Sequence, residues 1–226
     1  MPHFLLVHGA FHGPWCFDPL VEVLTRRGAV CTAPELPLTS LAADAAVVRR
    51  ALDEVASRGS GPVVLLGHSY GGAVVTAAGN HPAVERLVLL AALAPDTDEP
   101  TNGGPVEISP AVLSALRPAD GGLLAVDPAR TAELFYPDAT PADAAAAAAR
   151  LRPGATGLPH ERIERAAWLS RPTCYVVCAD DPIVLPRSQR ELAARTGAKT
   201  VEIAGDHSPF LARPEELAEL LLSLAG

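Results

Sequence analysis

Long hydrophobic runs are missing from this sequence of 226 residues. The longest apolar run extends from Leu87 to Ala94, far short of the roughly 20 residues that a membrane-spanning helix needs. We also expect no signal peptide, because Met1, Pro2 and His3 lead directly into a strand-like segment. We therefore expect a soluble, cytoplasmic protein that does not bind a membrane.

Clusters of basic residues are also missing. The chain has 18 Lys and Arg residues against 26 Asp and Glu residues, and its formal net charge is −8 at pH 7. Proteins that bind nucleic acids usually carry a basic patch, so no nucleic-acid partner is predicted.

Metal-binding patterns are absent too. The four cysteines are Cys16, Cys31, Cys174 and Cys178, and their spacing does not resemble a metal site. The last two lie on one predicted strand, too far apart to bridge each other, so reduced thiols are expected, as in cytosolic proteins.

Two histidines could suggest a metal pair. His8 and His12 lie four residues apart, but that spacing brings imidazoles together only on a helix, and these two lie in a glycine-studded loop. No metal and no cofactor are predicted.

What the sequence does contain is a regular alternation of strand-like and helix-like segments. Hydrophobic residues make up 49% and charged residues 19% of the chain, as in globular proteins, and its length suits one α/β domain. Apolar runs predict strands at residues 4–7, 29–33, 63–66, 84–90, 173–179 and 199–203. Helical patterns cover residues 18–27, 41–56 and 187–196, and a last one begins at Pro214. This order predicts an α/β fold with a doubly wound, mostly parallel six-stranded sheet.

The alternation stops between about residues 95 and 160. This stretch is rich in turn residues and proline, and Ala142 to Arg150 is almost entirely alanine, a good helix former with little to bury. We interpret it as a small lid of short helices and a hairpin, inserted into a single domain of residues 1–226. The alternative is a loosely ordered linker.

The segment from Val63 to Ala78 joins an apolar strand to a helix through the sequence Gly-His-Ser-Tyr-Gly-Gly. A Gly-x-Ser-x-Gly motif in that context is typical of a nucleophile elbow. The sharp turn strains the serine backbone and crowds the positions two before and two after it, which accounts for Gly67 and Gly71. We predict that Ser69 is the nucleophile; the alternative is an ordinary glycine-rich turn.

A serine nucleophile needs a base that is oriented by an acid, and in this architecture the acid precedes the histidine in the chain. His207 follows the last predicted strand, so it is expected at the sheet edge where Ser69 emerges. His207 is therefore the predicted base. His160, on the insert, is a weaker candidate.

The acid is expected at the end of the preceding strand, where two candidates stand side by side. Asp181 is preferred over Asp180 because an apolar segment directly after it would hold its carboxylate in place. Asp96 is an outside choice, and Asp206 is interpreted as a turn residue, because consecutive side chains of an extended segment point apart.

An oxyanion hole needs two backbone donors directed at one point. The N–H of Tyr70, next after the nucleophile, is one candidate, and the N–H of Ala10, in the loop after the first strand, is the other. An apolar substrate pocket could involve Phe11, Trp15, Tyr70, Phe135, Trp168 and Phe210, although core packing is at least as good an explanation for each.

Together these residues resemble the α/β-hydrolase superfamily, in particular the branch of plant methylesterases, hydroxynitrile lyases and bacterial EstC-type esterases. The resemblance covers nearly the whole chain and rests on residues 7–13, 67–72, 178–181 and 206–210. It implies that Ser69 is the nucleophile, Asp181 the acid and His207 the base. It also implies that the Ala10 and Tyr70 amides bind the oxyanion and that the insert faces the substrate.

Two positions depart from the hydroxynitrile lyases of that branch. Those enzymes carry a lysine directly after the catalytic histidine and a threonine directly after the first-strand histidine, whereas this chain has Ser208 and Gly9 there. Without the lysine, nothing obvious would stabilise a leaving cyanide, which disfavours the lyase interpretation.

The predicted function is a serine hydrolase that cleaves carboxylic esters of small to medium, apolar substrates through an acyl-enzyme. The predicted partner is a small-molecule ester, and formation of a homodimer stays open. One alternative is a lyase, lactonase or cyclase of a biosynthetic pathway that uses the same triad. The other is a ligand-binding receptor with residual hydrolysis.

Overall fold

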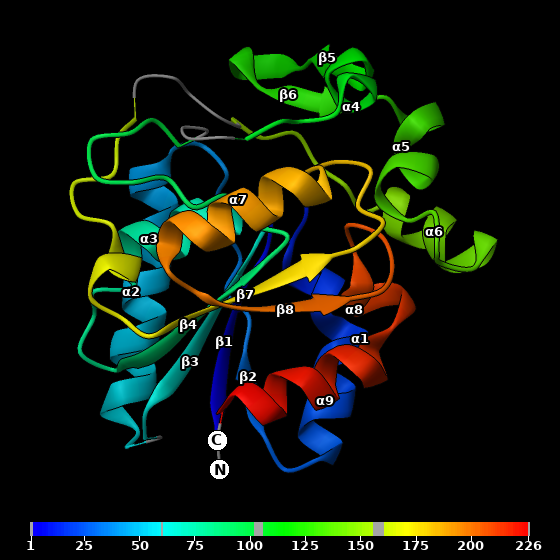
Figure 1. Ribbon diagram of the computed structural model, residues 1–226. Coiled ribbons are helices and arrows are strands. Elements are labelled where there is room, and N and C mark those ends of the chain that lie inside the picture. The colour runs from blue at the N-terminus through cyan, green and yellow to red at the C-terminus, as the bar shows by residue number, and fades with distance from the viewer. Residues whose placement is uncertain (1, 60, 102–105, 156–160, 226) are drawn as a thin grey trace.

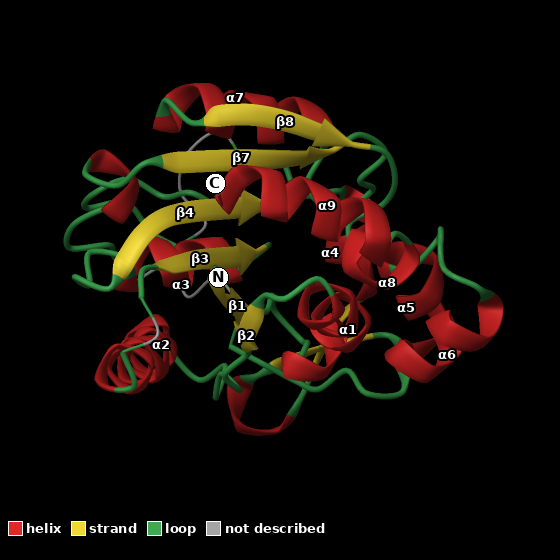
Figure 2. Cartoon of the chain, turned by 90° about the horizontal axis from the view of Figure 1, so that it is seen from below, coloured by secondary structure: helices red, strands yellow, loops and turns green. Residues whose placement is uncertain are grey.

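A six-stranded sheet lies at the centre of the computed structural model, which describes residues 2–59, 61–101, 106–155 and 161–225. The strands have the spatial order β2-β1-β3-β4-β7-β8, and every neighbouring pair is parallel (Figure 2). Their bounds are β1 (His3–Val7), β2 (Val30–Thr32), β3 (Val63–His68), β4 (Val84–Leu90), β7 (Thr173–Cys178) and β8 (Lys199–Ile203). The predicted fold class is confirmed, and the sheet is parallel throughout.

Helices cover both faces of this sheet (Figure 1). They are α1 (Asp18–Arg26), α2 (Leu41–Ser57), α3 (Gly71–Ala78), α7 (Pro186–Thr196), α8 (Pro209–Ala212) and α9 (Pro214–Ala225). Successive side chains of a strand point to opposite faces, so β1 contributes to two cores. Phe4 and Leu6 pack with α1 and α9, whereas Leu5 and Val7 pack with α2, α3 and α7. All four are fully buried, as expected for a strand covered on both sides.

The chain leaves the neighbouring strands β1 and β3 toward opposite faces of the sheet. Helix α1 follows β1 and helix α3 follows β3, and the two helices belong to different cores. The loops after β1 and β3 therefore diverge at the carboxyl edge of the sheet, which is where open α/β sheets bind ligands. Residues 8–13 and 69–70 lie at this edge.

Residues 106–155, called the cap below, contribute no strand to the six-stranded sheet. The elements of the cap are α4 (Pro110–Ala115), β5 (Leu116–Pro118), η2 (Asp120–Gly122), β6 (Leu124–Val126), α5 (Pro128–Phe135) and α6 (Pro141–Ala148). Strands β5 and β6 form an antiparallel hairpin that turns at Gly121 and Gly122, with φ angles of +69° and +75°. These are the short helices and the hairpin expected in the insert, and Figure 1 shows them in green beyond the carboxyl ends of the strands.

The alanine-rich helix α6 differs from the expectation in one respect. Ala144 and Ala147 are buried in a third core, together with Phe11, Phe135 and Tyr136. The inference that this segment has little to bury was therefore wrong at these two positions. Small side chains let the helix pack closely against the aromatic residues of the cap.

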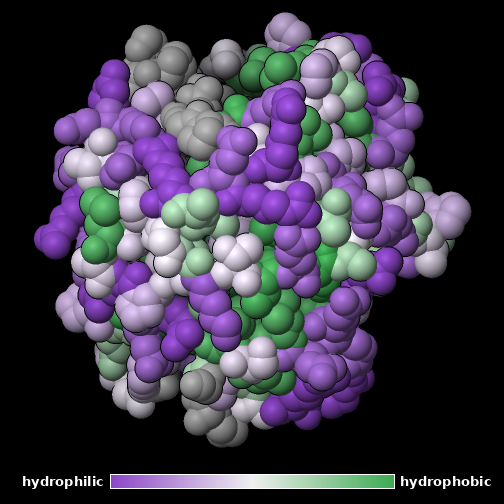
Figure 3. All heavy atoms as spheres, in the orientation of Figure 1, coloured by the Kyte–Doolittle hydropathy of each residue, from purple (hydrophilic) through white to green (hydrophobic). Residues whose placement is uncertain are grey.

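On the face seen in Figure 3, hydrophilic residues cover most of the surface, and hydrophobic residues show mainly over the cap and in the lower half. Leu113, on α4, is 57% exposed. Among the described residues, no helix is long and apolar enough to cross a membrane. The four cysteines are free, as predicted.

Candidate active site

Ser69 lies in the tight turn between β3 and α3. Its φ angle is +54°, in the left-handed region that side chains other than glycine rarely adopt, so the backbone strain predicted for the elbow is present. A Cβ atom on Gly67 would lie 2.5 Å from the Gly71 carbonyl oxygen, which explains why this position needs glycine. The half-buried Ser69 is thus held at the N-terminus of α3.

His207 and Asp181 form a buried pair at the same edge. His207 Nδ1 donates a hydrogen bond to Asp181 Oδ2 over 2.7 Å, and both side chains are almost fully buried. Asp180 is exposed, and its carboxylate accepts the Gly205 N–H instead. Of the two adjacent carboxylates, only Asp181 contacts His207.

The other acid and base candidates are not part of this pair. Asp96 accepts the N–H of Thr97, its own neighbour in the chain. Asp206 accepts the N–H groups of Ser208 and Asp138, the first of which is the turn contact expected of it. His160 lies outside the described residues.

The Asp181 carboxylate has three further donors. Oδ1 accepts the backbone N–H groups of Ile183 at 2.7 Å and Val184 at 3.1 Å, and Oδ2 accepts Gln189 Nε2 at 2.7 Å. Gln189 is itself fixed, because its Nε2 also donates to the Val184 carbonyl and its Oε1 accepts the Cys178 N–H. These contacts leave the carboxylate one orientation, in which Oδ2 faces His207.

His68, directly before the serine, holds His207 from the other side. Its Nε2 donates to the His207 carbonyl oxygen over 2.8 Å, and the centroids of the two rings are 4.6 Å apart. Complete burial, and the nearby His207, lower the pKa of His68 well below its usual value, so the ring stays neutral. The elbow and the loop that carries His207 are therefore linked directly.

Tyr70 is anchored through its side chain. Its hydroxyl donates to Asp44 Oδ2 over 2.7 Å, and Asp44 Oδ1 accepts the Leu38 N–H over 2.9 Å. Both side chains are buried, and burial raises the pKa of each. Within the described part of the chain, neither the Tyr70 N–H nor the Ala10 N–H donates to a protein acceptor. Both residues line the cavity described next.

A cavity of about 320 Å³ lies between this edge and the cap. The edge lines it with Ala10, Ser69, Tyr70 and His207, and the cap lines it mainly with Val112, Leu116, Leu124 and Phe135. Among the described residues that line it, none is Asp, Glu, Lys or Arg. The cavity is thus apolar, with its polar groups gathered at Ser69 and the neighbouring histidines.

Of the aromatic residues predicted to bind substrate, the structure brings Phe11, Tyr70 and Phe135 to this cavity and separates three others from it. Trp168 is buried in the core beside α3 and donates its Nε1–H to the Pro95 carbonyl. Phe210 is buried in the core between the sheet and α1. Trp15 stacks on the His12 ring, with ring centroids 5.7 Å apart. None of these three is among the described residues that line the cavity beside Ser69.

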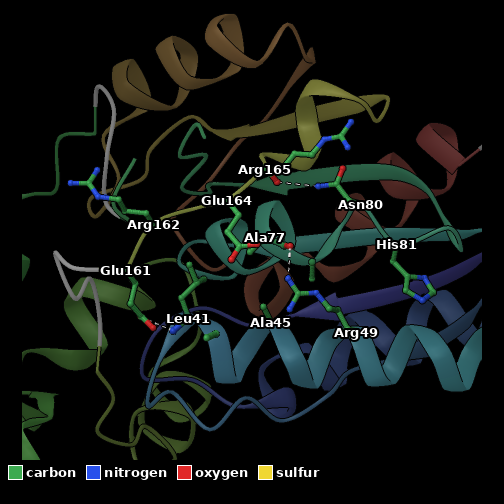
Figure 4. Close-up of a pocket in the computed structure, with 12 residues that line it drawn as sticks. Leu41, Ala45, Arg49, Ala77, Asn80, His81, Glu161, Arg162, Glu164 and Arg165 are labelled. Atoms are coloured by element: carbon green, nitrogen blue, oxygen red, sulfur yellow. Dashed lines mark hydrogen bonds between the residues drawn. The ribbon is translucent and has the colours of Figure 1, made fainter. Parts of the chain in front are cut away.

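A larger cavity of about 520 Å³ lies elsewhere, between α2, the end of α3 and residues 161–165 (Figure 4). It is lined by alanines and by charged side chains such as Arg49 and Glu161. Their visible contacts join neighbouring segments: Arg49 donates to the Ala77 carbonyl, and Glu161 accepts the Leu41 N–H. No Ser, Thr, Cys or Tyr is among the described residues that line it. Ser69, the predicted nucleophile, lines the smaller cavity.

Sequence reasoning missed Gln189, His68 and Asp44. Gln189 shares the buried face of α7 with Leu192 and Ala193, and Asp44 lies on the buried stripe of α2. A polar residue on an apolar helix face is the signal that could have marked both, because buried polar groups require partners.

Comparisons with known proteins agree with the fold described above. A sequence model described as the alpha/beta hydrolase family matches residues 4–220. Pyrethroid hydrolase from Sphingobium wenxiniae is 29% identical, over 98% of this chain and 86% of its own length. Esterase PIR7B from Oryza sativa subsp. japonica is 28% identical, over 99% of this chain and 96% of its own. The crystal structure of polyneuridine aldehyde esterase, at 21% identity, shares the fold over 100% of both chains with a TM-score of 0.83.

Proposed function

Since this chain belongs to the alpha/beta hydrolase family, we propose that it is a serine hydrolase that cleaves carboxylic esters of small to medium, apolar substrates. One observation carries the proposal. Ser69, on a strained elbow, and His207, paired with the buried Asp181, line the same apolar cavity. The names of the relatives, a pyrethroid hydrolase and an esterase, support ester hydrolysis as the reaction.

The proposed reaction begins with proton transfer from Ser69 to His207. The Nδ1–H of His207 is held by Asp181, so Nε2 of the neutral ring carries the lone pair that accepts this proton. As Ser69 Oγ attacks the ester carbonyl, the oxygen becomes negatively charged and accepts hydrogen bonds from the Ala10 and Tyr70 amides. His207 then protonates the leaving alcohol, and a water activated by the same ring hydrolyses the acyl-enzyme.

The lining of the cavity supports the proposal that the substrates are uncharged. It offers no charged side chain among its described lining residues, and a charged group moved into such a site would lose hydration without gaining a partner. The cap supplies aliphatic and aromatic surface, and burial of each methylene of a substrate there contributes about 0.8 kcal/mol. We expect kcat/KM to rise with acyl chain length until the cavity is filled.

A fluorophosphonate probe tests the proposal, because it phosphonylates activated serines. We expect labelling of the wild type and of Ser223→Ala, whose hydroxyl lies exposed on α9, and no labelling of Ser69→Ala. Labelling of Ser69→Ala would contradict the assignment of Ser69 as the nucleophile. Hydrolysis of a neutral ester in ¹⁸O-labelled water should place one solvent oxygen in the acid product, which a lyase reaction would not do.

A further inference from the structure

The loop of residues 8–13, between β1 and the 3₁₀ helix η1 (Pro14–Phe17), is held through its carbonyl groups. The Gly9 carbonyl accepts His8 Nδ1 at 2.9 Å, and the Ala10 carbonyl accepts His12 Nδ1 at 2.8 Å. The next two carbonyls are held by a single residue of the cap: Phe11 accepts the Arg152 backbone N–H at 2.9 Å, and His12 accepts Arg152 Nε at 3.1 Å. Four consecutive carbonyls of this loop thus have a donor.

These contacts determine where the Ala10 N–H points. A trans peptide is planar, so the Gly9 carbonyl and the Ala10 N–H of the same unit point in opposite directions. When His8 holds the carbonyl on one side, the N–H is directed to the other side. The orientation of the Ala10 N–H, the proposed oxyanion donor, is therefore fixed through the carbonyl of its peptide unit and not through a hydrogen bond of the N–H itself.

Arg152 also supports His8, through a second path. Arg152 Nη2 donates to the Leu36 carbonyl, and the Leu36 N–H donates to His8 Nε2 over 3.1 Å. Because His8 Nε2 accepts this bond, its Nδ1 must carry the proton that it gives to Gly9. A chain of hydrogen bonds thus runs from Arg152 through Leu36 and His8 to the peptide that carries the Ala10 N–H.

A second cap residue reaches the same loop. The Tyr136 hydroxyl lies 2.9 Å from His12 Nε2, which leaves His12 Nδ1–H to bind the Ala10 carbonyl. Burial lowers the pKa of His12 to about 3 and that of His8 to about 4, so both rings stay neutral and keep this pattern near neutral pH.

We propose that Arg152 is a positioning residue of the oxyanion hole, through which the cap holds the Ala10 amide in its productive orientation. The inference rests on the proposed function. An arginine suits the task because its planar guanidinium reaches two carbonyls in different segments, those of His12 and Leu36, whereas a lysine presents a single point of charge. The Arg152 guanidinium also forms an ion pair with Glu35, in which Nη1 lies 3.5 Å from Oε1.

The chain offers a matched control two positions away. Arg150 lies over the Trp15 ring, with its guanidinium carbon 4.7 Å from the ring centroid, and pairs with the exposed Asp18 at 3.7 Å. Among the described residues, the donors to the four loop carbonyls are His8, His12 and Arg152, and Arg150 is not one of them. Arg150→Ala therefore removes the same charge from the same segment without removing the proposed support.

The experiment compares wild type, Arg152→Ala, Arg152→Lys and Arg150→Ala in hydrolysis of a neutral ester and in the rate of fluorophosphonate labelling. For both Arg152 variants we expect kcat and the labelling rate to fall roughly 10- to 100-fold while KM changes less than about threefold, because the lost contact matters only when the oxyanion forms. Arg150→Ala should match the wild type. Guanidinium ion added to Arg152→Ala should restore part of kcat.

A second variant guards against a purely structural explanation. Tyr136→Phe keeps the ring and removes only the hydroxyl that holds His12, so it should lower kcat by roughly 3- to 10-fold with KM unchanged. Full kcat in the Arg152 variants, or a rise in KM alone, would overturn the inference and leave the proposed function intact. The inference would also be overturned if the unfolded fraction of each variant, measured by thermal denaturation, accounted for its entire loss of activity. Wild type that is neither labelled nor active would overturn both.

Discussion

Replacing Asp181 by asparagine tests the candidate site at the point where the structure is most specific. Oδ1 of this carboxylate accepts two backbone N–H groups, so the amide oxygen of an asparagine must take that place. Its NH₂ group then occupies the Oδ2 position, where the Gln189 amide and His207 Nδ1–H both donate in the wild type. Gln189 cannot turn over to accept, because its Oε1 is bound to the Cys178 N–H.

The expected loss follows from the tautomer of the histidine. Facing a donor, His207 must carry its proton on Nε2 and accept at Nδ1, so Nε2 has no lone pair for the Ser69 proton. The equivalent exchange in a Ser-His-Asp triad lowers kcat about 10⁴-fold. This corresponds to about 5 kcal/mol of activation free energy, and we expect a loss of this order in Asp181→Asn.

Asp180→Asn is the matched control, because the exposed Asp180 carboxylate meets the Gly205 N–H rather than His207. Both variants should be compared with the wild type in the acylation burst with a p-nitrophenyl ester, with thermal unfolding measured alongside. The reasoning fails if Asp181→Asn keeps more than about a tenth of the wild-type acylation rate, or if Asp180→Asn is equally impaired.

Three further predictions follow from burial and close contacts. Gly67→Ala should lower the free energy of unfolding in urea by at least about 2 kcal/mol, because the new Cβ would lie 2.5 Å from the Gly71 carbonyl oxygen; an unchanged midpoint would contradict the tight elbow. Gln189→Leu should reduce kcat about tenfold and stability by about 2 kcal/mol, because it leaves the Cys178 N–H unpaired and removes a donor from Asp181; both are read from kinetics and urea unfolding. Burial of His8 lowers its pKa to about 4 from 6.5, so the stability that its neutral form provides is complete above pH 6.5 and about 3 kcal/mol of it is lost as the pH falls to 4. His8→Gln should flatten the dependence of unfolding free energy on pH in this window, and an unchanged slope would show that His8 is not the group that titrates.

The sheet and the elbow could be predicted from the sequence because each rests on a local pattern. Phe4 to Val7 is a short apolar run without alternation, and the structure buries every side chain of it between two layers of helices. The elbow is specified by a motif of small residues, and its strained serine follows from the same crowding. Such features depend on residues that are neighbours in the chain.

The aromatic residues show where residue type stops being informative. Phe135 lies in the cap and Trp168 shortly after it in the chain, and both are large and apolar. Phe135 nevertheless lines the cavity, whereas Trp168 fills the core beside α3. Hydrophobicity predicts that each is removed from water and does not distinguish a cavity wall from a packed interior. Only the positions of the neighbouring elements decide between the two.

Functional backbone groups are the part of the site that is hardest to predict from sequence. The two proposed oxyanion donors are amides, which every residue except proline carries, so nothing in the identity of Ala10 marks it as a donor. What distinguishes it is the set of contacts on the neighbouring carbonyls, made by His8 beside it and by Arg152 far along the chain. Arg152 looks in sequence like one of several arginines in a polar insert, and Arg150 shares its charge without its contacts. A site built from peptide groups is therefore visible only once the fold brings their partners together, and the residues that orient the peptides distinguish the site from an ordinary loop.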